Sequence, residues 1–140
     1  MNFESSLNDI FAIKAPALPT NIRDIIVKIT PYFTIISVVI SIPAILALFG
    51  IGTLVLPFAL MGKGIGIATL VSAVILVSSA YLEITAINGL FARRAAAWRK
   101  LFYVSLLSAI SALLGGNITG LIIGSIISWY FLFQVRSQYR

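Results

Sequence analysis

Residues 101–135 read LFYVSLLSAISALLGGNITGLIIGSIISWYFLFQV, which is 35 consecutive residues without a charged side chain. A helix needs about 20 residues to cross the hydrocarbon core of a bilayer, so this stretch is too long for one straight span. Gly115-Gly116-Asn117 divides it almost evenly and is the strongest turn signal in the chain. The stretch therefore predicts a hairpin of two membrane-spanning helices, over residues 96–114 and 118–134.

A second uncharged run, residues 29–62, contains 34 residues. Residues 30–49 are long enough for one span, and Gly50 and Gly52 are expected to end it. Residues 53–61 include a proline and are too short to cross as a helix. We expect them to form a re-entrant or interfacial turn, or a kinked extension of the first span.

The remaining span is predicted over residues 65–90, after the chain reverses at Gly62-Lys63-Gly64. The predicted fold class is therefore all-α: a polytopic membrane protein whose four transmembrane helices form a bundle within residues 21–140. The composition agrees, with 60% hydrophobic residues, 10% charged residues and a mean hydropathy of +1.08. A soluble domain carries about 25% charged residues to cover its surface.

Residues 1–20 are predicted to form a short amphipathic helix and a proline-containing linker outside the bundle. Phe3, Leu7, Ile10 and Phe11 recur at helical spacing, and the linker runs from Lys14 to Pro19. The helix is expected either to lie along the membrane surface or to pack onto the loops of the bundle.

The cationic residues are distributed unequally between the two sides of the predicted bundle. With four spans, Lys63 stands alone on one side, and the other nine of the ten cations share the opposite side: Lys14, Arg23, Lys28, Arg93, Arg94, Arg99, Lys100, Arg136 and Arg140. Because cytoplasmic loops carry the excess of Lys and Arg, both termini are predicted to be cytoplasmic in a multi-pass protein of the plasma membrane.

Glu83 is the only acidic residue inside any predicted span. A charge at the bilayer centre costs about 2.5 to 3.5 kcal/mol on insertion scales, so such an acid is a functional candidate. Counting about 12 Å inward from the cytoplasmic end of each helix reaches a layer of hydroxyl side chains. We expect Glu83 to hydrogen-bond within this layer, whose candidates are Ser37, Ser105, Ser108 and Ser128. Alternatively, Glu83 only sets helix register, or it reaches interfacial water near Arg93 and Arg94.

Small residues recur every four positions in the last span, in the manner of a glycine zipper: Gly116, Gly120, Gly124 and Ser128. Such a stripe lies on one face of a helix and lets a neighbouring backbone approach closely. It predicts a helix-packing seam. The partner is either the preceding helix of the same hairpin or a second copy of the chain.

Several classes of function are not expected from this sequence. The chain has no cysteine and no histidine, which removes disulfides, thiolate chemistry and imidazole bases. We predict no catalytic residue, metal site or cofactor, and therefore no enzyme. The cations do not form a stripe among exposed polar residues, so nucleic acid is not an expected partner. The expected partner is the lipid bilayer, together with a homo-oligomer or another membrane protein.

Both ends of the chain resemble small, uncharacterised, four-helix integral membrane proteins of bacterial genomes. The resemblance is carried by the Lys14–Pro19 linker and by the segments Gly115-Gly116-Asn117-Ile118, Ser128-Trp129-Tyr130 and Leu132-Phe133-Gln134-Val135-Arg136. It implies a bacterial inner membrane and no particular activity. The favoured interpretation is a structural or partner-binding membrane protein. The alternative is a small, oligomeric transporter or channel subunit with a path lined by Glu83 and the nearby serines.

Overall fold

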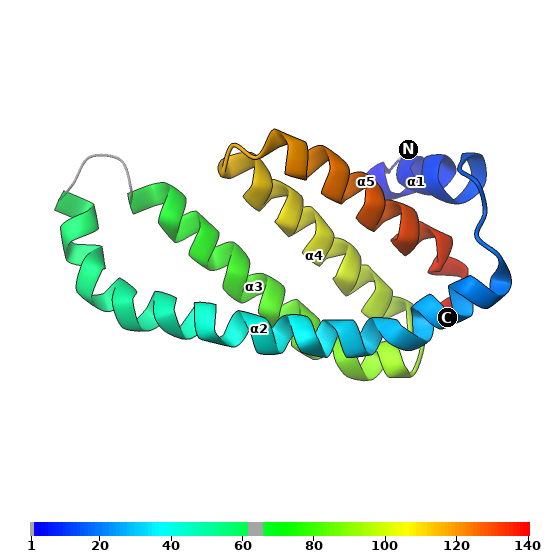
Figure 1. Cartoon of the computed structure of the whole chain (residues 1–140), viewed down its shortest axis with the longest axis horizontal. Coiled ribbons are helices and arrows are strands. Elements are labelled where there is room, and N and C mark those ends of the chain that lie inside the picture. Colours follow the sequence, from blue (N-terminus) through cyan, green and yellow to red (C-terminus); the bar gives the residue numbers. More distant parts are fainter. Residues whose placement is uncertain (1, 62–65) are drawn as a thin grey trace.

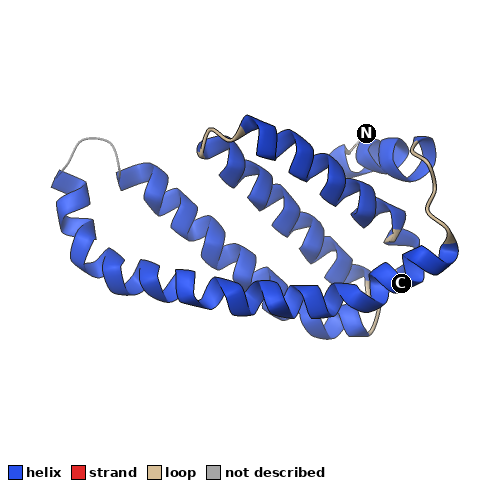
Figure 2. Cartoon of the chain, in the orientation of Figure 1, coloured by secondary structure: helices blue, strands red, loops and turns tan. Residues whose placement is uncertain are grey.

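Helices account for nearly all of the chain. The structure is a computed structural model that describes residues 2–61 and 66–140. Its elements are α1 (Phe3–Asn8), the π-helical turn η1 (Asp9–Lys14), α2 (Thr20–Met61), α3 (Gly66–Phe91), α4 (Ala95–Leu114), α5 (Ile118–Gln134) and the 3-10 turn η2 (Arg136–Gln138). The described residues contain no strand (Figure 2). The predicted all-α fold class is confirmed.

Four segments are long and apolar enough to cross a membrane: Thr20–Ala47, Leu70–Phe91, Ala95–Leu114 and Ile118–Gln138. Large apolar side chains cover their outer faces. Ile40, Val74 and Ile118, for example, are 69%, 65% and 60% exposed. Such surfaces are unfavourable in water but are solvated by hydrocarbon. The protein is therefore a multi-pass membrane protein.

The spans lie side by side in chain order, so that α2 packs against α3, α3 against α4, and α4 against α5 (Figure 1). Both termini and the α3–α4 turn lie at one end of this arrangement, which we call the basic end. The α4–α5 turn lies at the other end, which we call the opposite end. Short turns make consecutive helices antiparallel neighbours, which explains the order.

Helix α2 corrects one expectation, because it continues through Gly50 and Gly52 instead of ending there. In hydrocarbon, an ended helix leaves backbone groups without hydrogen-bond partners, so glycine is tolerated inside a span. The helix is visibly curved (Figure 1), and Pro31 and Pro43 each remove a backbone hydrogen bond from its interior. Residues 53–61 thus extend the first span. The predicted reversal at Gly62-Lys63-Gly64 lies outside the described residues.

The hydrophobic core lies at the basic end and draws on every span and on the N-terminal segment. Its buried members are Leu7, Val27, Ala86, Leu90, Ala97, Trp98, Phe102, Phe133, Val135 and Tyr139. Trp98 stacks on Phe102 with ring centroids 5.7 Å apart, and its ring meets Phe133 edge to face. Outside this cluster, the buried apolar residues of the described chain are Val38, Ile75 and Ala80, on α2 and α3.

The N-terminal segment packs onto helix α5 of the bundle, and not onto the loops that the sequence suggested as one alternative. Leu7 is buried in the core, and the Phe11 ring lies 6.4 Å from the Trp129 ring of α5. Ile10 and Ile13 remain 50% and 68% exposed. The segment therefore buries one apolar face against α5 and leaves another available to lipid.

Gly89 permits a close approach of α3 to α4 near the basic end. A Cβ atom built on Gly89 would lie 2.8 Å from the Cβ atom of Ala97. We expect Gly89→Val to destabilise the protein by about 1–3 kcal/mol, because overpacking forces the two helices apart. Unfolding in detergent measures this loss. Gly124→Val is the matched control, since a Cβ there meets nothing within 4 Å. Equal losses in both variants would contradict the prediction.

Candidate functional site

Helices α2, α3 and α4 enclose a polar groove of about 510 Å³ within the apolar spans. Its polar lining residues are Ser37 and Ser41 from α2, Ser72, Ser79 and Glu83 from α3, Ser108 and Ser111 from α4, and Asn117 from the following turn. A polar group removed from water costs free energy unless it finds a hydrogen-bond partner. So many polar groups in an apolar region make this groove the candidate functional site.

Glu83 lies on the groove side of α3 and is partly buried. The Ser37 hydroxyl of α2 donates a hydrogen bond to Glu83 Oε1, with 3.3 Å between the two oxygens. This bond is longer than the usual value of about 2.7–2.8 Å for hydroxyl donors. The carboxylate is therefore held toward α2 but keeps capacity for a further partner.

The four serines expected near Glu83 divide between two grooves. Ser37 and Ser108 line the groove that contains Glu83. Ser105 and Ser128 line a second groove of about 320 Å³ between α4 and α5. There, the Ser105 hydroxyl donates to the Phe102 carbonyl at 2.6 Å and accepts from Trp129 Nε1 at 3.1 Å. The sequence prediction grouped these serines because they lie at the same depth in the membrane. In the structure, the rotation of each helix about its axis places them on different faces.

Five polar lining residues were not among the candidates from the sequence: Ser41, Ser72, Ser79, Ser111 and Asn117. A signal for some of them was present. Ser72, Ser79 and Glu83 stand at i, i+7 and i+11, which places them on one face of α3. Helical periodicity from Glu83 along α3 would have added Ser72 and Ser79 to the predicted site. The sequence of α3 does not indicate which faces of α2 and α4 these serines meet.

The small-residue stripe is shorter than its sequence pattern. Gly116 lies in the α4–α5 turn, with a φ of 71°, and so precedes the helix. Gly120 contacts the Asn117 side chain, which accepts a hydrogen bond from the Gly120 N–H at 3.0 Å and caps α5. A Cβ built on Gly124 would have nothing within 4 Å, so α4 makes no close approach there. A seam with a second copy stays a prediction.

A polar cluster at the basic end is centred on Gln134, which is only 2% exposed. Its Oε1 accepts from the Leu18 N–H and from Arg23 Nη2, each at 3.1 Å. Its Nε2 donates to the Phe11 carbonyl at 2.7 Å and to the Pro16 carbonyl at 3.4 Å. One side chain thus joins α5 to the N-terminal turn, the linker and α2. No sequence pattern singled it out.

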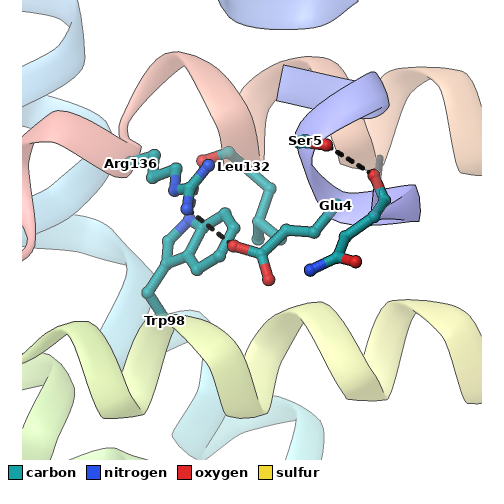
Figure 3. A network of polar contacts seen from close by, with 6 residues as sticks. Glu4, Ser5, Trp98, Leu132 and Arg136 are labelled. Atoms are coloured by element: carbon teal, nitrogen blue, oxygen red, sulfur yellow. Dashed lines mark hydrogen bonds and ion pairs between the residues drawn. The ribbon is translucent and has the colours of Figure 1, made fainter. Parts of the chain in front are cut away.

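Two ion pairs reinforce the basic end. Arg136 Nη2 lies 2.6 Å from Glu4 Oε1, and the same guanidinium lies over the Trp98 ring, 5.0 Å from its centroid (Figure 3). Arg93 Nη1 lies 3.1 Å from Asp24 Oδ1. Both pairs are partly exposed, and exposed pairs contribute only about 0–1 kcal/mol each. Their main effect is to orient the N-terminal segment and α2.

The C-terminal residues dock onto the α3–α4 turn. The Arg140 N–H donates to the Arg93 carbonyl at 2.8 Å, and the Ala95 N–H donates to the Arg140 carbonyl at 3.0 Å. Burial raises the pKa of the Tyr139 hydroxyl above its ordinary value of 10.0, while the nearby Thr30 and Arg93 side chains oppose that shift. The phenol is therefore neutral near pH 7.

The two polar regions differ in what remains available for binding. At the basic end, the Gln134 amide and both ion pairs find their partners within the chain. The groove instead gathers hydroxyls and one carboxylate, which are suited to a polar helix surface, water or a cation. Comparison of the chain with protein families, with curated proteins and with solved structures finds no match. Any functional conclusion therefore depends on the chemistry of the groove.

Proposed function

We propose that this protein is a non-enzymatic membrane subunit that binds a transmembrane helix over the groove, and that a second copy of the chain supplies this helix. The observation that carries the proposal is the polar lining of a partly open groove within apolar spans. Lipid tails offer no hydrogen bonds to hydroxyl groups, whereas an opposing helix does.

A second copy is favoured over an unrelated helix by symmetry. In a two-fold contact the same surface serves both subunits, so each groove covers the other. Both sets of hydroxyl groups then gain partners in a single interface. Interhelical hydrogen bonds in membranes contribute about 1–2 kcal/mol each in model peptides, so several serines suffice for a stable contact.

We also propose that both termini are cytoplasmic and that the host membrane is a bacterial inner membrane. The uneven distribution of the ten cations, nine against Lys63, supports this orientation. A reporter fused to either terminus tests it. An outward-facing signal from either end would contradict the proposed orientation.

Cysteine cross-linking tests the second copy, and the chain has no native cysteine to interfere. In a bilayer, Ser111→Cys in the groove is expected to form a disulfide-linked dimer upon mild oxidation. Tyr81→Cys is the matched control, because Tyr81 is 66% exposed and does not line the groove. Monomeric Ser111→Cys, or equal cross-linking at both positions, would refute the contact.

A transporter or channel subunit is the second candidate. It is favoured by the course of the groove, whose polar lining continues from Asn117 in the α4–α5 turn to Glu83 deep inside α3. A two-fold pair of such grooves would enclose a polar space between the subunits. Cation flux in proteoliposomes that is lost in Glu83→Gln would favour this candidate over a purely structural role.

A further inference from the structure

The groove has a direction along the membrane normal. At the opposite end its lining includes Asn117, in the turn that precedes α5, and Ser72, near the start of α3. At its other extreme the lining ends at Glu83. The eleven residue steps from Ser72 to Glu83 correspond to about 16 Å along a helix, which is roughly half of the hydrocarbon core.

Toward the basic end, packed side chains close the groove. Within one turn beyond its lining residues stand Thr34 on α2, Ala86 on α3 and Phe102 on α4, which are 6%, 0% and 4% exposed. Behind them lie Leu90 and Trp98, which are 1% and 2% exposed and belong to the hydrophobic core. Protein interiors of this kind are close-packed and leave no continuous path for water.

Glu83 stands at this closed end without an opposite charge in the groove. It is the one ionisable residue among the described residues that line the groove. From α2 it accepts a hydrogen bond from the neutral Ser37 hydroxyl. On α4, the Lys100 ammonium donates to a backbone carbonyl of α3 at 3.2 Å. Tyr81 and Tyr103 on α3 and α4 are both more than half exposed and lie outside the lining.

We propose that the groove is a half-channel that opens only toward the opposite end, and that one monovalent cation enters through it and binds at Glu83. A single carboxylate surrounded by neutral hydroxyl groups matches one positive charge, either a proton or an alkali-metal ion. A divalent ion usually requires additional carboxylates. The occupant neutralises a charge that is otherwise costly in the bilayer. The half-channel does not depend on the second copy proposed above.

One-sided access is tested with a single cysteine at position 79, between Ser72 and Glu83. In sealed vesicles, Ser79→Cys should react with a membrane-impermeant cationic thiosulfonate added on the side of the α4–α5 turn, and not with reagent added on the side of the termini. Ile123→Cys is the control: its native side chain is 54% exposed on α5, where hydrocarbon is expected, so neither side should label it. Labelling of Ser79→Cys from the terminal side, from both sides equally or from neither side overturns the proposal.

The same measurement separates the half-channel from the second copy. Cross-linked Ser111→Cys together with unlabelled Ser79→Cys would retain the second copy and reject the half-channel. Labelled Ser79→Cys without cross-linking of Ser111→Cys would retain the half-channel and reject the second copy.

The cation is tested by thermal unfolding of the full chain in detergent. Sodium chloride added at constant pH and ionic strength, against choline chloride, raises Tm by about 2–8 °C if an alkali-metal ion binds. If the occupant is a proton, acidification gives the rise and sodium does not. Either response should vanish in Glu83→Gln and persist in Glu4→Gln, an acid outside the spans.

Responses that are identical in the wild type and in Glu83→Gln, or a wild type that responds to neither cation, overturn the proposal. Glu83→Asp keeps the carboxylate and provides a second variant if Glu83→Gln fails to fold. It should retain the response, because the charge remains at the closed end of the groove.

Discussion

Trp98→Ala is expected to lower the free energy of unfolding by about 3–5 kcal/mol, the usual loss for a large aromatic side chain in a core. Trp98 is 2% exposed, stacks on Phe102 and meets Phe133 edge to face, and Arg136 lies over its ring. Its Nε1 also donates to the Leu132 carbonyl at 2.8 Å, near the C-terminal end of α5 (Figure 3). Removing the side chain leaves a cavity and an unpaired carbonyl at the point where α4 and α5 meet.

Denaturant titration in detergent measures this loss of free energy of unfolding. Two further variants separate its causes. Trp98→Phe keeps an aromatic ring and removes the indole donor. Its loss of free energy of unfolding should be smaller, and it reports the hydrogen bond together with the difference in volume between the two rings. Tyr103→Ala on the same helix is the control, because Tyr103 is 52% exposed and lies outside the core cluster. A loss for Trp98→Ala no larger than that for Tyr103→Ala would show that the core does not hold the basic end together.

Gln134→Leu should release the N-terminal segment from the bundle. Leucine approximates the volume of glutamine but makes none of the four hydrogen bonds to Leu18, Arg23, Phe11 and Pro16. Each buried group left unpaired costs about 1–3 kcal/mol, and a charged group costs more. The Arg23 guanidinium is such a group. The linker therefore separates from α5, and its backbone becomes accessible.

Limited trypsin digestion of the folded protein measures the release as faster cleavage after Lys14, where the linker begins. We expect the cleavage rate to rise by about tenfold or more, since a loss of 1.4 kcal/mol changes a local opening equilibrium tenfold. Gln138→Leu is the matched control, with the same change four residues later in η2. Unchanged cleavage in Gln134→Leu would mean that the aromatic contacts of Phe11 hold the segment without the amide.

The fold was more predictable than the candidate site. The turn at Gly115-Gly116-Asn117 and the charge-free runs were sufficient for the α4–α5 hairpin and for the existence of four spans. The prediction that Gly50 and Gly52 end the first helix was wrong, whereas the alternative of an extension of that span through residues 53–61 is confirmed. Glycine ends helices in water, where backbone groups find other partners, but not in hydrocarbon. The groove was only partly anticipated, through Glu83, Ser37 and Ser108.

The sequence alone determined that lipid surrounds this protein and that it has four helices long enough to cross a bilayer. Hydropathy and span length act locally, since a run without charges either fits the thickness of the bilayer or does not. Tertiary structure alone decided which serines share a groove with Glu83 and that Gln134 joins four segments. These outcomes depend on the rotation of each helix about its axis, which is set by contacts such as Trp98 against Phe133 between residues far apart in the chain.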